Sequence, residues 1–156
     1  MKQPSNLELA LCAGLPWGLK GSVDADPYVL IFMDHNGRTL WRDENNKKRT
    51  CYNAIPHYFP LEYLTQEITI STYKDGKPFV PVCVLCELYY GSQNYEAPEF
   101  CDTELEDVEM SMMNICRDKS AITLEMADIL HSWHFNVYNL SPDQFINAAE
   151  SKIYEK

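Results

Sequence analysis

The chain has 156 residues, of which 46% are hydrophobic and 23% charged, and its formal net charge at pH 7 is −10. This length and apolar content indicate one globular domain with its own core, and they exclude a disordered chain. The acidic balance argues against contact with a phosphate backbone, so we expect no direct nucleic-acid partner.

Cysteine content and hydropathy indicate a protein of the reducing cytoplasm. The chain has six cysteines, and its first residues lack the charged and then apolar pattern of a secretory signal, so we expect reduced thiols. The longest nearly apolar run, residues 79–88, contains Pro81 and Glu87 and falls far short of the roughly 20 residues of a membrane helix. We therefore expect a cytoplasmic protein with no membrane span.

The N-terminal residues predict a short helix. Ser5 and Glu8 have the spacing of a capping box, in which each side chain satisfies an exposed backbone amide of the first turn, and Gly14 can end the helix. Pro16 and the flanking glycines prevent its continuation, and we expect Trp17 to be buried as an anchor.

Two hairpins are predicted in the first half of the chain. Residues 28–33 and 39–41 are rich in β-branched and aromatic residues and flank a turn at residues 34–37. Residues 67–73 alternate in hydrophobicity and are followed by a turn and a returning arm at residues 78–80.

The segment between these hairpins has weaker signals. Residues 43–49 are polar and predict a loop, and residues 50–52 predict a short strand. Residues 55–60 contain two prolines, so we expect no regular structure there, and residues 61–64 can form one helical turn.

Two middle segments remain ambiguous between helix and strand. Pro81 suits the first position of a helix over residues 82–90, with a buried strand as the rival interpretation. Thr103 and Glu106 match a capping box before residues 105–115, whose apolar spacing favours a helix. A strand is the alternative for residues 108–115, because their apolar residues also alternate.

The C-terminal part predicts two more helices. Met126, Leu130 and Trp133 recur on one face of a helix that we expect to end near His134, before an extended segment at residues 135–138. Ser141 is expected to cap a last helix with an apolar stripe of Phe145, Ile146, Ala149 and Ile153.

These elements predict a single α+β domain over residues 1–156. We expect a small antiparallel sheet, built from the two hairpins, to pack against helices from both termini and from the acidic middle segment.

Candidate catalytic and metal-binding patterns are weak. Cys83 and Cys86, with His131 and His134, have the spacing of zinc ligands, but the cysteines lie in an apolar run where two buried thiols explain them as well. We expect both histidines to be partly buried and bonded to a carbonyl or hydroxyl.

Two nuclease patterns are also weak. The pair Asp34 and His35, followed by His57, resembles a His-Asn-His nuclease, but prolines beside His57 prevent the helix of that unit. Asp143 with Glu150 and Lys152 matches a metal-nuclease signature in letters only, because all three would lie on one helix. We therefore predict no catalytic residue, no metal ligand and no cofactor.

The charge is concentrated in one segment. Residues 78–116 contain eight acidic residues and no Lys or Arg, while the rest of the chain carries 15 acids against 13 bases. A solvated face that keeps the protein soluble is one interpretation. The other is a negative surface for a basic partner protein. The residues expected to form that surface are Glu99, Asp102, Glu104, Glu106, Asp107 and Glu109.

Two motifs resemble a known group of proteins. Residues 15–20 (LPWGLK) and 133–140 (WHFNVYNL) resemble the LPYGLK-like opening and WHFDVFGL-like ending of short uncharacterised proteins encoded by phages and prophages of gut bacteria. Residues 60–65 and 77–82 are similar to the middle section of that group.

The chain departs from this group at Trp17, Asn136 and Asn139, where the group usually has Tyr, Asp and Gly. The resemblance implies a phage-derived protein inside a bacterial host cell, and it implies no activity. The middle of that group looks strand-rich, which weakens the prediction of a helix at residues 108–115.

The expected function is that of a non-enzymatic acidic interaction protein that binds a basic host protein. It could act as a nucleic-acid-mimicking inhibitor of a host nuclease or defence factor. A small metal-dependent hydrolase or nuclease is the alternative. The sequence leaves the oligomeric state open.

Overall fold

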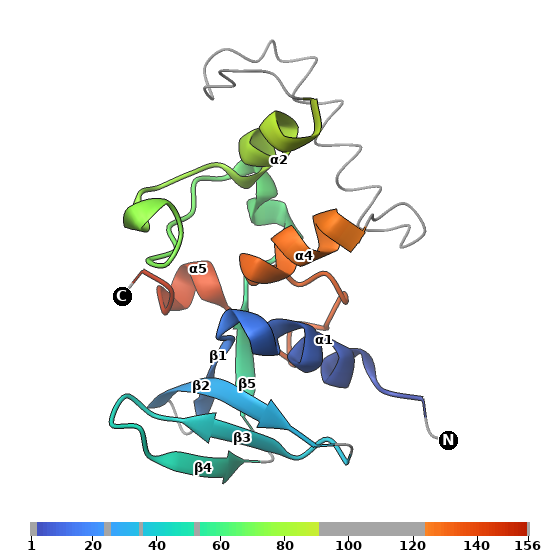
Figure 1. The fold of residues 1–156 in the computed structure, drawn as a ribbon, viewed down its shortest axis with the longest axis vertical. Helices are drawn as coiled ribbons and strands as arrows, with labels where there is room; N and C mark the ends of the chain where they lie inside the picture. Colours follow the sequence, from blue (N-terminus) through green and yellow to red (C-terminus); the bar gives the residue numbers. More distant parts are fainter. Residues whose placement is uncertain (1–2, 24–25, 35, 52–53, 91–123, 156) are drawn as a thin grey trace. The chain divides into compact units, whose positions relative to one another are not determined.

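A computed structural model describes residues 3–23, 26–34, 36–51, 54–90 and 124–155 (Figure 1). The chain divides into two compact units. The sheet unit comprises Met1–Pro60 and Ile129–Tyr154, and the helical unit comprises Leu61–Asp128 with Glu155–Lys156. Whether these two units form the single domain predicted for residues 1–156 is not tested by this division, so the single domain stays a prediction.

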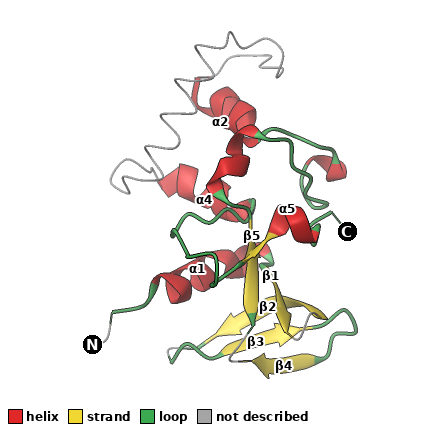
Figure 2. Cartoon of the chain, turned by 180° about the vertical axis from the view of Figure 1, so that it is seen from behind, coloured by secondary structure: helices red, strands yellow, loops and turns green. Residues whose placement is uncertain are grey.

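The sheet unit is built on a six-stranded sheet in the order β4-β3-β2-β1-β5-β6, drawn yellow in Figure 2. Its strands are β1 (Lys20–Val23), β2 (Asp26–Met33), β3 (Thr39–Arg42), β4 (Lys48–Cys51), β5 (Ile55–Tyr58) and β6 (Ile146–Asn147). Neighbouring strands pair antiparallel except β5 and β6, which are parallel. The sheet and the helices confirm the predicted α+β class, and β2 with β3 confirms the first predicted hairpin.

The predicted opening helix is confirmed as α1 (Asn6–Gly14). The capping box is present, because the Ser5 backbone N–H donates to Glu8 Oε2 at 2.6 Å and the Glu8 N–H donates to Ser5 Oγ at 3.2 Å. A 3-10 turn at Leu15–Trp17 follows. The expected burial of Trp17 is wrong, because its side chain is 47% exposed.

The core of the sheet unit lies between α1 and one face of the sheet. Cross-strand pairing places Tyr28 beside Gly21, and Leu30 beside Trp41, on that face. Leu30 and Trp41 are buried and pack with residues of α1 in one apolar cluster. A side chain of this kind contributes about 1.5–3 kcal/mol when buried. A Cβ at Gly21 would lie 2.6 Å from Trp41 Cζ3, so Trp41 occupies the space that this glycine leaves.

Strand β5 corrects the prediction that residues 55–60 have no regular structure. Pro56 pairs with Gly21 of β1, whereas the parallel pairing with β6 involves only His57 and Tyr58. Pro56 therefore has a neighbouring strand only on the β1 side. A proline is tolerated at such a position, because its missing N–H can face the side that has no partner strand.

The last predicted helix is mostly wrong. The Ser141 N–H and hydroxyl do donate to Gln144 Oε1, at 3.1 and 3.0 Å, as a cap would. The chain then pairs with β5 as β6, and the helix α5 (Ala148–Ser151) is only four residues long, with Asn147 as its N-cap. The prediction failed because Ile146, which belongs to the predicted apolar stripe, pairs with β5 in a strand.

The helical unit contains 3-10 turns at Leu61–Thr65 and Lys74–Gly76 and the helix α2 (Pro81–Tyr90). The helical turn at 61–64 and the helix over 82–90 are confirmed. Helix α4 (Leu124–Ser132) is also as predicted, and its last four residues belong to the sheet unit. The predicted helix over residues 105–115 lies outside the described residues.

The second predicted hairpin is reduced to a single bridge between Ile68 and Phe79. The chain between them forms the 3-10 turn at Lys74–Gly76, with Lys74 and Asp75 at positive φ angles of 46° and 56°. The turn is held by aromatic packing, because the Tyr73 and Phe79 ring centroids are 4.6 Å apart and Lys74 Nζ lies 6.0 Å from each ring.

Candidate functional site

In the described residues, His57 on β5 is the centre of a hydrogen-bonded cluster of ionisable and hydroxyl side chains. Ser22 on β1 pairs with Ile55, two residues before His57, so Ser22 and His57 share one face of the sheet. His57 Nε2 lies 2.6 Å from Ser22 Oγ, and His57 Nδ1 lies 2.9 Å from Ser151 Oγ at the end of α5. The histidine is only 3% exposed, so both ring nitrogens are held inside the sheet unit.

The neighbouring hydrogen bonds indicate which ring nitrogen of His57 carries the proton. The Ser151 hydroxyl donates to the Ala148 carbonyl at 3.3 Å, so it accepts from His57 Nδ1–H. Nε2 is then the acceptor for the Ser22 hydroxyl. Neutral His57 with its proton on Nδ1 satisfies both contacts.

Tyr154 extends the cluster to the end of the chain. Its hydroxyl donates to the His57 carbonyl at 2.9 Å and accepts from the Lys20 backbone N–H at 3.1 Å, so it bridges β5 and β1. Lys20 Nζ donates to the Ile153 carbonyl at 2.7 Å. Burial raises the pKa of the Tyr154 hydroxyl, which keeps it protonated and able to donate.

His134 lies on the other side of Tyr154. Its ring stacks on the Tyr154 ring, with centroids 4.2 Å apart and planes inclined by 8°. The side chain is 3% exposed, and its buried Nδ1 has no hydrogen-bond partner among the described residues, which corrects the bond to a carbonyl or hydroxyl expected for His134. The His131 ring stacks on the Tyr138 ring, with centroids 5.4 Å apart.

Buried His57 and His134 are both neutral at physiological pH. Burial, and then the positive charge of Lys20, lowers the pKa of His57 to about 4. Burial, followed by Lys20 and His131, lowers the pKa of His134 to about 3. A second positive charge beside Lys20 would have little water to stabilise it.

Chemically, a serine hydroxyl that donates to a neutral imidazole has the arrangement of a nucleophile and its base. The same bonds join three segments, β1, β5 and α5, that are far apart in the sequence. We therefore interpret the His57 cluster, meaning Lys20, Ser22, His57, Ser151 and Tyr154, as a clamp that holds the C-terminal segment on the sheet.

The residues predicted from metal and nuclease patterns have other surroundings. His57 lies on a strand, and His35 is outside the described residues. Cys83 is buried in α2, where burial and then Glu87 raise the pKa of its thiol. Among the described residues, no group of three or more His, Cys, Asp or Glu side chains is placed to hold a metal ion.

The six carboxylates predicted to bind a partner all fall between residues 91 and 123, outside the described part of the chain. Conversely, sequence reasoning missed the His57 cluster. Ser22 and His57 are 35 residues apart, and His57 and Ser151 are 94 apart, so no local motif connects them.

No helix within the described ranges is long and apolar enough to cross a membrane. Comparison of the chain with known protein families, with curated proteins and with solved structures finds no match.

Proposed function

We propose that this chain is a non-enzymatic interaction protein of phage or prophage origin that binds a basic host protein through its acidic segment. The observation that supports this proposal is the separation of charge. Eight acidic residues and no Lys or Arg lie between residues 78 and 116, whereas the rest of the chain, with 15 acids and 13 bases, is close to neutral. The proposed contact residues are Glu99, Asp102, Glu104, Glu106, Asp107 and Glu109.

Concentrated carboxylates favour a particular kind of partner. A run of like charge attracts a basic surface over several ångströms, which speeds association and makes it sensitive to salt. A basic surface that normally binds nucleic acid is the natural complement, so the partner class is a host nuclease or another nucleic-acid-binding defence factor. In the chain, the six proposed contact residues lie between helices α2 and α4.

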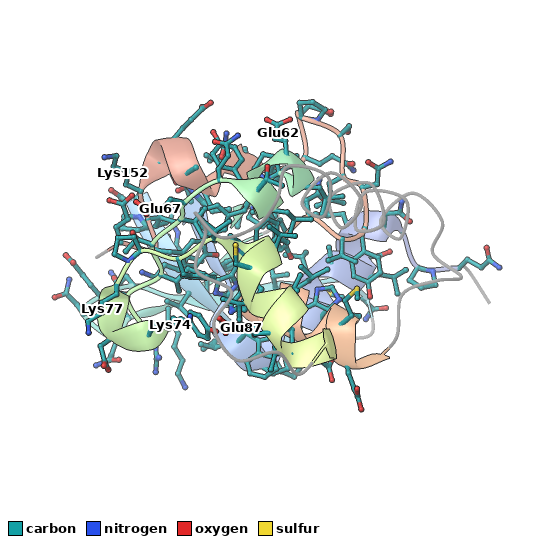
Figure 3. The ribbon with its side chains drawn as sticks, turned by 90° about the horizontal axis from the view of Figure 1, so that it is seen from above. Glu62, Glu67, Lys74, Lys77, Glu87 and Lys152 are labelled. Atoms are coloured by element: carbon teal, nitrogen blue, oxygen red, sulfur yellow. The ribbon has the colours of Figure 1, made fainter. Side chains whose placement is uncertain are left out.

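Affinity capture from host lysate tests the proposal with a matched control. The test variant is E104K/E106K/D107K, and the control variant E44K/E62K/E67K makes the same change in net charge at three exposed positions. Figure 3 labels Glu62 and Glu67 of the control set. We expect the test variant to lose a basic partner that the wild type and the control retain, and we expect high salt to release that partner. Equal recovery by all three proteins contradicts the proposal.

The alternative of a small metal-dependent hydrolase or nuclease makes different predictions. It requires hydrolysis of an ester or nucleic acid that depends on magnesium, manganese or zinc, and one bound equivalent of metal in bulk analysis. Calorimetry with calcium and magnesium measures whether the carboxylates simply bind a cation. Such binding without hydrolysis and without a partner protein would be a third outcome, distinct from both proposed functions. Metal-dependent turnover by the wild-type chain would favour the alternative.

A further inference from the structure

Among the described strands, β4 is an outer strand of the sheet. Its residues Lys48 to Cys51 pair with β3, and β4 ends the strand order opposite β6. The backbone groups of an edge strand that point away from the sheet can pair with another extended chain. Lys48, Arg49 and Thr50 are all exposed, so such a chain could approach them.

Two cationic side chains, Arg42 and Lys48, lie beside this edge, and the turn that joins β3 to β4 carries the carboxylates Asp43 and Glu44. Cross-strand pairing places Lys48 beside Arg42, and both side chains are exposed on the face of the sheet opposite the α1 core. Asp43 lies at the turn between β3 and β4, but its Oδ1 accepts from the backbone N–H groups of Asn45 and Lys47, at 2.9 and 2.8 Å. The carboxylate therefore shapes the turn.

Two apolar side chains, Phe32 and Leu40, lie next to these two cations on the same face. Phe32 of β2 pairs with Leu40 of β3, which pairs with Thr50 of β4. The Phe32 side chain is 54% exposed, so a partner could contact it. The described residues on this face of β2, β3 and β4 include no carboxylate.

We propose that the β4 edge binds an extended, acidic segment of a partner protein by strand addition. Backbone hydrogen bonds to β4 would supply the pairing. A strand carrying carboxylates at alternate positions would place them on the face of Arg42 and Lys48, where the charges are complementary. This site lies in the sheet unit and is independent of the acidic segment.

Charge also selects against other occupants. A second copy of β4 would bring Lys48 and Arg49 against like charges, which destabilises cross-strand pairs. A single-stranded nucleic acid could stack a base on Phe32, but it has no backbone amides to pair with β4.

Fluorescence anisotropy with a labelled peptide, Glu-Val-Glu-Thr-Glu-Val-Glu, tests the site on the full chain. We expect binding that weakens as salt is added. The variant R42E/K48E should bind at least about tenfold more weakly, because attraction becomes repulsion at two positions. The control K77E/K152E, which changes the same charge at two exposed lysines labelled in Figure 3, should bind as the wild type does.

Peptide analogues distinguish strand addition from plain charge attraction. N-methylation of one alternate set of amides should abolish binding, while methylation of the other set should leave it intact, because only one set faces β4. Replacing every Glu with Lys should abolish binding. Four results would overturn the proposal: no binding of the acidic peptide, equal binding to R42E/K48E, equal effects of the two methylated sets, or tighter binding of an oligo-dT strand.

Discussion

Acid should destabilise the sheet unit through His57 and His134, two of its buried histidines. The pKa of His57 is lowered from 6.5 to about 4, and that of His134 from 6.5 to about 3. Both histidines are therefore neutral in the fold and take up protons on unfolding. Their stabilising contribution is fully present above the unfolded pKa of 6.5, and it is lost as the pH falls towards the folded values.

The magnitude follows from the difference in proton uptake. At pH 5 an unfolded histidine is almost fully protonated, whereas folded His57 is almost fully neutral, so the fold loses about 2 kcal/mol relative to pH 7.5. His134 loses about 2 kcal/mol more by the same reasoning. The total of about 4 kcal/mol is a large part of the roughly 5–15 kcal/mol that stabilises a typical domain.

Urea unfolding followed by tryptophan fluorescence measures this loss. The three tryptophans, Trp17, Trp41 and Trp133, all lie in the sheet unit, so the signal reports that unit. His57→Gln removes one of the two titrating groups, and the loss between pH 7.5 and pH 5 should then fall to about 2 kcal/mol. Carboxylates that also titrate in this range are common to both proteins and cancel in the comparison. An identical pH dependence for the wild type and H57Q would refute the reasoning.

Three further predictions concern packing, thiol reactivity and backbone conformation. Gly21→Ala should cost about 1–3 kcal/mol in urea unfolding, because its Cβ would lie 2.6 Å from Trp41 Cζ3. In a double-mutant cycle, Gly21→Ala should cost less free energy of unfolding when Trp41→Phe is also present. If the costs of the two substitutions simply add, the predicted contact between the added Cβ at position 21 and Trp41 is wrong. Iodoacetamide should modify exposed Cys12 well before buried Cys83, whose thiol pKa is raised, as followed by mass spectrometry; equal rates would contradict this. Asn139 has a φ of +52°, so Asn139→Gly should keep the stability while Asn139→Val costs about 1–2 kcal/mol, and equal melting of the two variants would show the reasoning to be mistaken.

Local signals in the sequence predicted the elements that local interactions determine. The Ser5 and Glu8 capping box, Pro81 at the start of α2, and the turn between β2 and β3 each depend on residues a few positions apart. Such patterns can be read without knowledge of the fold.

Two of the errors, at residues 55–60 and in the last helix, have a common cause in pairing between distant segments. Pro56 argues against a strand when it is considered alone. In the fold it pairs with β1 on one side, and β6 pairs with β5 only at His57 and Tyr58, so the proline is tolerated. The same pairing brings residues 146–147 to β5 and shortens the last helix. The His57 cluster depends on these long-range pairings, so nothing in the local sequence predicts it.

The point where the chain leaves the sheet unit and the point where it returns are bonded to each other. The Phe59 N–H donates to the His134 carbonyl at 2.8 Å, and the Asn136 N–H donates to the Phe59 carbonyl at 3.0 Å. With respect to the sheet unit, residues 61–128 of the helical unit are a long insertion, or loop, between these two bonded positions. The entropic cost of such a loop grows only slowly with its length, so evolution can lengthen, shorten or exchange this insertion while the host fold keeps its own ends together.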